Sequence, residues 1–166
     1  MTDVHDDQSD RIAQLTGKDD TREYITVMIN QQLFGMAIDQ VHDVFSPQNM
    51  TPVPKSRPEI AGVLNLRGRI VTAIDMRERL GLEKRPDDAV PMAVGIEHKG
   101  ESYGLVIDEV GEVMRLPIAG IEPPPSNLDS RWSEIALGVH RLEGALIVIL
   151  DVERVLSFGP IRRNAA

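Results

Sequence analysis

The stretch Gly62–Leu80, GVLNLRGRIVTAIDMRERL, decides the fold of this chain. It opens with an apolar strand, turns tightly at Arg67-Gly68, and continues as a second apolar strand as far as Asp75. Gly68 can adopt the positive φ that such a turn demands. The pattern therefore predicts a strand–turn–strand unit.

A short helix should follow this unit, from Met76 to Leu80. Asp75 is a favourable N-cap, and Glu78 is placed to complete a capping box with it. Gly81 is the kind of residue at which such a helix ends.

The same pattern returns downstream as Gly138–Leu156, GVHRLEGALIVILDVERVL, in which Asp151 should cap a helix over 151–157. Without gaps, at a constant offset of 76 residues, the two copies share Gly62/Gly138, Val63/Val139, Leu66/Leu142, Gly68/Gly144 and Asp75/Asp151. An internal repeat of this kind predicts two similar structural units.

The repeat extends upstream of both copies at an offset of 69 residues. It pairs Phe34-Gly35, Ile38-Asp39, Val41 and Val44 with Tyr103-Gly104, Ile107-Asp108, Val110 and Val113. The longer loop Pro117–Asn127 accounts for the difference between the two offsets. Small antiparallel sheets avoid exposed edges by curling into barrels, so we expect two similar all-β barrels, back to back, with short helices.

The remaining segments are less regular. Glu23–Asn30 and Gln32–Ile38 predict a β-hairpin, whereas the periodicity of Asp39–Ser46 fits either a helix or a strand. The prolines of Pro47–Pro54 predict a loop. Ser56–Glu59 has the hydroxyl, proline and acid of a helix start. A further hairpin, with its turn at residues 98–100, joins segments 91–97 and 103–110.

The composition restricts the class of protein. A length of 166 residues suits one domain, or two small subdomains that share a core, and the absence of cysteine excludes disulfides and thiol chemistry. No signal peptide is evident, and the longest apolar run, Ala145–Leu150, is far shorter than the roughly 20 residues of a membrane span. We therefore expect a soluble, cytoplasmic protein.

The net charge of −8 is concentrated at the N-terminus, where residues 1–20 carry six acids and two bases. This balance argues against binding to nucleic acid, which requires a basic face. We expect residues 1–21 to form a disordered acidic tail, residues 22–158 to fold, and residues 159–166 to form a second tail.

The sequence offers no obvious catalytic or metal site. The histidines His5, His42, His98 and His140 are isolated, and no phosphate-binding glycine loop or nucleophile elbow occurs. The acid pairs Asp39/Asp43 and Asp108/Glu112 could be proposed for acid–base work. However, Asp39 and Asp108 are equivalent in the repeat, which favours a structural turn or cap.

Arg67 is where the two copies differ most informatively, because the second copy has Glu143 at this position. A guanidinium beside an apolar strand can recognise a carboxylate or a carbonyl on a partner. The alternative, a solvated turn residue or an internal ion pair with a nearby acid, is equally compatible with the sequence.

These residues together resemble a known family. Gly62–Gly68 (GVLNLRG), Ile70–Asp75 and Arg77 resemble the signature of the bacterial chemotaxis coupling protein family CheW, and residues 138–151 agree with it. The resemblance extends over residues 23–158. The chain departs from the family pattern at two positions. Thr72 stands where proline is common, and Asp43 stands where the longer glutamate is frequent. These departures point to a diverged receptor or kinase partner.

The resemblance implies a fold and a function. The fold is two pseudo-symmetric five-stranded SH3-like β-barrels that share a hydrophobic core. The function is that of a non-enzymatic adaptor, without cofactor or metal, that links transmembrane chemoreceptors to the histidine kinase CheA in cytoplasmic arrays. Its membrane association would come only through these partners.

The resemblance also implies the binding sites. A groove between the barrels would receive the helical tip of the receptor at Val41, Asp43, Arg67 and Val113. The regulatory domain of the kinase would bind near Gly62 and Gly138.

Two rival hypotheses remain open. The first is a coupling protein of a non-motility chemosensory pathway. The second is a hydrolase or binding protein that holds a small molecule between the barrels; it requires convergent polar groups that the sequence does not display.

Overall fold

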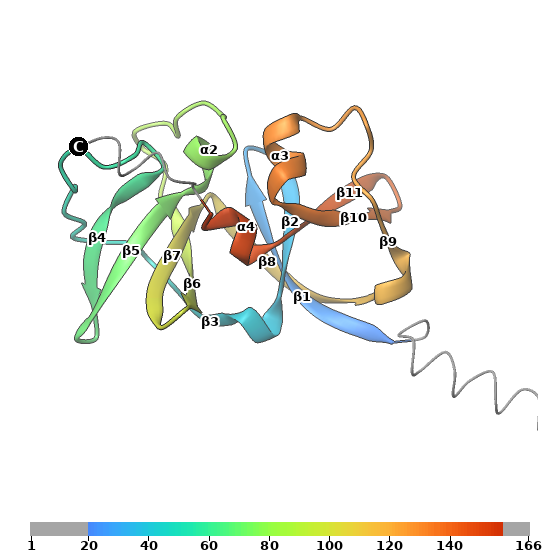
Figure 1. Ribbon diagram of the computed structural model, residues 1–166, viewed down its shortest axis with the longest axis horizontal. Coiled ribbons are helices and arrows are strands. Elements are labelled where there is room, and N and C mark those ends of the chain that lie inside the picture. The colour runs from blue at the N-terminus through green and yellow to red at the C-terminus, as the bar shows by residue number, and fades with distance from the viewer. Residues whose placement is uncertain (1–19, 158–166) are drawn as a thin grey trace, which may run out of the picture.

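The computed structural model describes residues 20–157, which form two curled sheets side by side (Figure 1). Barrel 1 has the strand order β8-β1-β2-β11-β10-β9. Its strands are β1 (Thr21–Ile29), β2 (Gln32–Ala37), β8 (Glu109–Pro117), β9 (Ile121–Glu122), β10 (Ala136–Leu142) and β11 (Ala145–Leu150). Barrel 2 has the order β3-β6-β7-β5-β4. Its strands are β3 (Val41–Phe45), β4 (Ile60–Leu66), β5 (Arg69–Asp75), β6 (Met92–His98) and β7 (Glu101–Ile107).

The expected all-β fold of two barrels is confirmed, with one short additional strand, β9, in barrel 1. Segment 39–46, which fitted helix or strand, is largely β3 after the 3-10 turn η1 (Ile38–Gln40). β1 already begins at Thr21. Asp20 is also described, and its carbonyl accepts the Ile118 N–H at 2.9 Å. Residues 1–19 of the predicted N-terminal tail, and the predicted tail 159–166, lie outside the described residues.

The two barrels do not coincide with the two halves of the sequence. The first hairpin, β1–β2, pairs with β8 and β11 from the second half, whereas the hairpin β6–β7 pairs with β3 and β5 from the first. The chain crosses between the barrels twice, through η1 and at Asp108 between β7 and β8. Each barrel is therefore built from one half's hairpin and the other half's remaining strands.

The short helices are α2 (Met76–Arg79), α3 (Ser130–Ile135) and α4 (Val152–Val155), and η2 is a 3-10 turn at Ile118–Gly120. The predicted caps are confirmed: the Asp75 carboxylate accepts the Arg77 N–H, and the Asp151 carboxylate accepts those of Glu153 and Arg154. Helix α3 was not predicted from the sequence. None of the helices within residues 20–157 has the length and apolarity to cross a membrane.

Two local predictions are wrong. Ser56–Glu59 forms turns rather than a helix, because the Ser56 hydroxyl donates to the Val53 carbonyl and the chain enters β4 at Ile60. The capping box at Glu78 is wrong because the Asp75 N–H donates instead to the Glu59 carbonyl, at 2.7 Å.

The apolar core has three parts. The largest lies between the barrels and combines residues of both sheets and of all three helices, such as Phe34, Leu105 and Val152. A smaller cluster around Phe45 fills barrel 2, and another around Tyr24 fills barrel 1. The predicted shared core is thus confirmed, and it is larger than the interior of either barrel.

Trp132, the only tryptophan of the chain, ties the barrels together from α3. Its indole N–H donates to the Leu80 carbonyl at 3.2 Å, beyond the end of α2, and its ring packs against Phe34 of β2 at a centroid distance of 5.4 Å. An aromatic ring with one polar atom suits this junction, where an apolar surface meets a free helix-end carbonyl.

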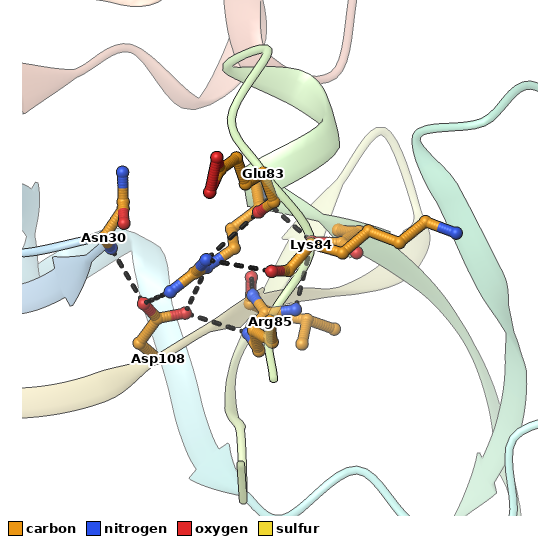
Figure 2. Close-up of polar contacts among 8 residues, drawn as sticks. Asn30, Glu83, Lys84, Arg85 and Asp108 are labelled. Carbon is orange, nitrogen blue, oxygen red and sulfur yellow. Dashed lines mark hydrogen bonds and ion pairs between the residues drawn. The ribbon is translucent and has the colours of Figure 1, made fainter. Parts of the chain in front are cut away.

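The second crossing is held by a polar cluster around the Asp108 carboxylate (Figure 2). Arg77 of α2 donates to both carboxylate oxygens, at 3.1 and 2.6 Å, and Arg85 donates at 2.8 Å. The N–H of Asn30, in the β1–β2 turn, donates at 2.8 Å. The cluster thus joins a turn of barrel 1 to a helix and a connector of barrel 2.

The pKa of Asp108 follows from these contacts. Burial alone would raise it, but the hydrogen bonds from Arg77 and Asn30 and the charges of Arg77 and Arg85 outweigh burial and lower the pKa of the carboxyl. Correspondingly, the bonds to Asp108 raise the pKa of Arg77 despite its burial. The ionised carboxylate is therefore favoured in the folded state.

This shift predicts how stability depends on pH. Because the pKa of Asp108 is lower in the folded than in the unfolded protein, its contribution is present above an ordinary aspartate pKa of about 4 and is lost as pH falls through the folded pKa. We expect Asp108→Asn to show a shallower loss of unfolding free energy from roughly pH 5 to pH 2, measured by urea titration. Equal slopes for variant and parent would contradict the assignment.

Candidate functional site

The site is built around the turn between β4 and β5. Arg67 and Gly68 have φ values of 54° and 83°, so both central residues are left-handed, as in a type I′ hairpin. The Gly68 N–H donates to the Asn65 side-chain oxygen at 2.9 Å. In the second copy Gly144 has a positive φ of 76° but Glu143 does not. The copies therefore differ in turn conformation as well as in charge.

This turn places Arg67 opposite Asp43. The guanidinium donates to the Asp43 carboxylate at 2.8 Å, across the gap between β4 and β3. These are the two edge strands of barrel 2, which are not paired with each other. The ion pair thus spans the open seam of the barrel. The Asp43 side chain is 30% exposed and that of Arg67 is 73% exposed, so Arg67 remains accessible.

A cleft of about 330 Å³ opens beside this ion pair and leads toward the interior of barrel 2. Its apolar lining comes from Phe45, Leu66, Val71 and Ile96. Its polar and remaining lining comes from His42, Asp43, Arg67, Arg69, Gly95, Ser102 and Tyr103. The lining combines an apolar floor with a polar rim.

The charges of the rim are balanced within the protein. Glu97 lies 3.8 Å from the Arg69 guanidinium and 3.5 Å from His42, and Asp43 holds Arg67. A rim of paired charges around an apolar floor suits a protein surface with an apolar anchor and a few charges better than a phosphate or a small anion.

The predicted receptor-binding residues are only partly brought together. Asp43 and Arg67 are in direct contact at the cleft. Val41, on the same strand, packs against the core between the barrels. Val113 is 49% exposed on β8 of barrel 1 and does not line the cleft. The internal ion pair, one of the two alternatives for Arg67, is thus present in the free protein.

Of the residues that line the cleft, only Asp43 and Arg67 were predicted as site residues; those not assigned to the site include Phe45, Leu66, Arg69 and His42. Phe45 and His42 belong to a segment whose periodicity fitted helix or strand equally. Arg69 reaches the site only because β5 lies between β4 and β7. The pairing between distant strands that assembles this cleft has no local signature.

The two predicted kinase-site glycines have a structural explanation. Both follow a β-bulge, and each faces a neighbouring backbone carbonyl. A Cβ at Gly62 would lie 2.7 Å from the Thr51 carbonyl oxygen, and one at Gly138 would lie 2.5 Å from that of Glu122. These glycines allow a close approach of strands. Next to Gly138, however, Leu137 is 54% exposed on barrel 1.

The acidic pairs and histidines do not converge. Asp43 and Asp108 are held by arginines, and the Asp39 carboxylate lies 3.6 Å from Arg22. Both ring nitrogens of His140 are buried without a hydrogen-bond partner. Within residues 20–157, no three His, Asp or Glu side chains gather as a metal site requires.

Comparisons with known proteins agree with this architecture. The model of the CheW-like domain family matches residues 23–158. The chemotaxis protein CheW of Thermotoga maritima is 26% identical over 135 residues, covering 81% of this chain and 87% of that protein. CheW of Bacillus subtilis is 28% identical, covering 80% and 85%.

A solved structure shares the fold as well. The scaffolding protein TtCheW from Thermoanaerobacter tengcongensis superposes with a TM-score of 0.74 at 27% identity, covering 83% of this chain and 94% of that one. The family model spans strands of both barrels and the turn that carries Arg67. This chain therefore belongs to the CheW family of chemotaxis scaffold proteins.

Proposed function

We propose that this protein is a non-catalytic adaptor that couples transmembrane chemoreceptors to the histidine kinase CheA in receptor arrays. Membership of the CheW family supports the general role of a chemotaxis scaffold. The observation that supports the specific role, the coupling of receptors to the kinase, is the cleft at the seam of barrel 2, which has an apolar floor beside the accessible Arg67.

The cleft fits the tip of a receptor helix. A helix that docks in a groove inserts a few apolar anchors and uses charged side chains to fix its register. Phe45, Leu66 and Ile96 would receive such an anchor, and Arg67 would donate to a carboxylate or a helix-end carbonyl of the receptor. In this proposal Val113, exposed on barrel 1, is reached by a receptor hairpin that extends over both barrels, and Val41 supports β3 from the core.

The kinase would bind elsewhere, near Gly138 and Gly62. Two exposed apolar side chains mark these neighbourhoods: Leu137, 54% exposed beside Gly138, and Val53, 37% exposed, two residues beyond the Thr51 carbonyl that faces Gly62. Separate faces are what an adaptor requires, since both partners must be bound at the same time. Arrays for motility and for other chemosensory outputs need the same two contacts.

Arg67→Glu tests the receptor site. We expect its affinity for a receptor cytoplasmic fragment to fall at least tenfold, or about 1.4 kcal/mol, measured by isothermal titration calorimetry. The free energy of unfolding should change by less than about 1 kcal/mol, because the ion pair is largely exposed. Kinase binding should be unchanged.

The matched control is Glu143→Arg, the equivalent turn position in barrel 1, which should leave receptor affinity intact. If Arg67→Glu unfolds the protein, or if Glu143→Arg weakens receptor binding equally, Arg67 does not mark the receptor site.

Leu137→Asp tests the kinase face. Placing a charge on an apolar contact should weaken binding to the CheA regulatory domain at least tenfold without affecting the receptor fragment, in biolayer interferometry with each partner. Val53→Asp is the comparison for the neighbourhood of Gly62. Wild-type affinity for the kinase domain in both variants would exclude both neighbourhoods.

A further inference from the structure

The two crossings between the barrels are equivalent in the sequence repeat but not in their interactions. Asp39 marks the first crossing and Asp108 the second, 69 residues later. The Asp39 side chain is 67% exposed, and the half-exposed Arg22 guanidinium lies 3.6 Å from its carboxylate. The first crossing is therefore held by the packing of Ile38 and Val41 against the core and not by buried polar contacts of its aspartate.

The second crossing is held from several directions. The Asp108 side chain is 19% exposed, and each of Arg77 and Arg85 is 12% exposed. The backbone N–H of Asp108 also donates to the Met28 carbonyl of β1, at 3.0 Å. Figure 2 shows Asn30 and Arg85 approaching the carboxylate from opposite sides. Charge-assisted, partly buried bonds of this kind fix geometry far better than an exposed pair.

Arg85 extends this cluster to the connector, residues 80–91, which joins α2 to β6. It donates to Asp108, to Asp75 at 3.2 Å and to the Val106 carbonyl at 3.0 Å. Arg77 in turn donates to the Glu83 carbonyl at 3.0 Å. The connector is thus fastened to the crossing, and through Asn30 to barrel 1.

The other large contact between the barrels is apolar. The core shared by Phe34, Leu105, Val152 and their neighbours resists separation of the barrels, but the hydrophobic effect is non-directional and constrains their relative angle less than hydrogen bonds do.

Other hydrogen bonds between the barrels also start or end on α2 or the residue after it: Arg79 donates to the Val155 and Arg154 carbonyls, at 2.9 Å each, and Trp132 donates to the Leu80 carbonyl. These directional contacts lie on the α2 side, and the crossing at Asp39 lies apart from them as a pivot.

We infer that Asp108, Arg77, Arg85 and Asn30 form a one-sided clamp that fixes the angle between the two barrels, with the Asp39 crossing as its hinge. If the proposed function holds, the clamp also fixes the angle between the receptor cleft on barrel 2 and the part of the kinase site around Gly138 on barrel 1. A signal could then pass through the adaptor as a change in this angle.

The absence of native cysteine allows a direct test. Spin labels at Glu101→Cys, in the β6–β7 hairpin of barrel 2, and Glu143→Cys, in the β10–β11 hairpin of barrel 1, would report the distance between exposed points of the two barrels by double electron–electron resonance. In this background we expect Asp108→Asn to widen the distance distribution at least twofold. The matched variant Asp39→Asn should leave it unchanged.

Arg85→Gln keeps the test decisive if Asp108→Asn fails to fold, since it removes one arm of the clamp and should widen the distribution to a smaller extent. Circular dichroism and the fluorescence of Trp132 verify folding. An unchanged width in Asp108→Asn and Arg85→Gln, or equal widening in Asp39→Asn, would overturn the clamp.

A second readout separates the clamp from the proposed function. With both partners present, Asp108→Asn should retain each binary affinity and lose at least half of the receptor-dependent control of kinase activity. If the parent protein binds neither partner, the proposed function fails, while the spin-label result still decides the clamp. Widening without any loss of control would restrict the clamp to a structural role.

Discussion

Each barrel of this protein is incomplete without a hairpin from the other half of the chain, and the rest of the structure depends on this exchange. It places β1 and β2 against β8 and β11, and β6 and β7 against β3 and β5. Because the hairpins are exchanged, the two crossings lie in the middle of the molecule, and the largest part of the core lies between the barrels. We therefore expect the two barrels to unfold together in one cooperative transition, unlike two independent domains joined by a linker.

The two copies of the repeat share their strand pairing but differ in the conformation of one turn and in their side-chain chemistry. Asp43 and Arg67 close the seam of barrel 2, whereas their equivalents in barrel 1, Glu112 and Glu143, are both acids and cannot form such a pair. Asp39 and Asp108 differ in the same way, one exposed and one enclosed by arginines. The two barrels therefore differ: the cleft beside Arg67 belongs to barrel 2, and of the two crossings only that at Asp108 is enclosed by arginines. Different partners can thus distinguish one barrel from the other.

Features that depend on local sequence patterns could be predicted from the sequence. The constant offsets, the caps Asp75 and Asp151 and the turn at Gly68 predicted the strand–turn–strand–helix units and the two-barrel fold. The sequence alone could not assign the hairpins to barrels, because either pairing buries the same apolar faces. Arg85 was not singled out, since its contacts with Asp75 and Asp108 exist only after the sheet has formed. Arg67 was found because its counterpart in the second copy has the opposite charge, whereas His42 and Arg69 face the uncharged Gly111 and Ala145 in the second copy and were not singled out.

The hairpin exchange also has a consequence for biosynthesis. All strands of barrel 2 have been made once Ile107 has left the ribosome, but β2 must wait for β11, whose partner residue Ile147 pairs with Leu33. The first hairpin to be synthesised is therefore among the last to be enclosed. Until β11 has been synthesised, the apolar side chains of this hairpin, including Phe34 and Met36, lack some of the neighbours that bury them in the folded protein. Contacts between residues so far apart in sequence slow folding and leave nascent strands open to aggregation. The N-terminal hairpin is thus the part of barrel 1 that waits longest for its final neighbours during translation.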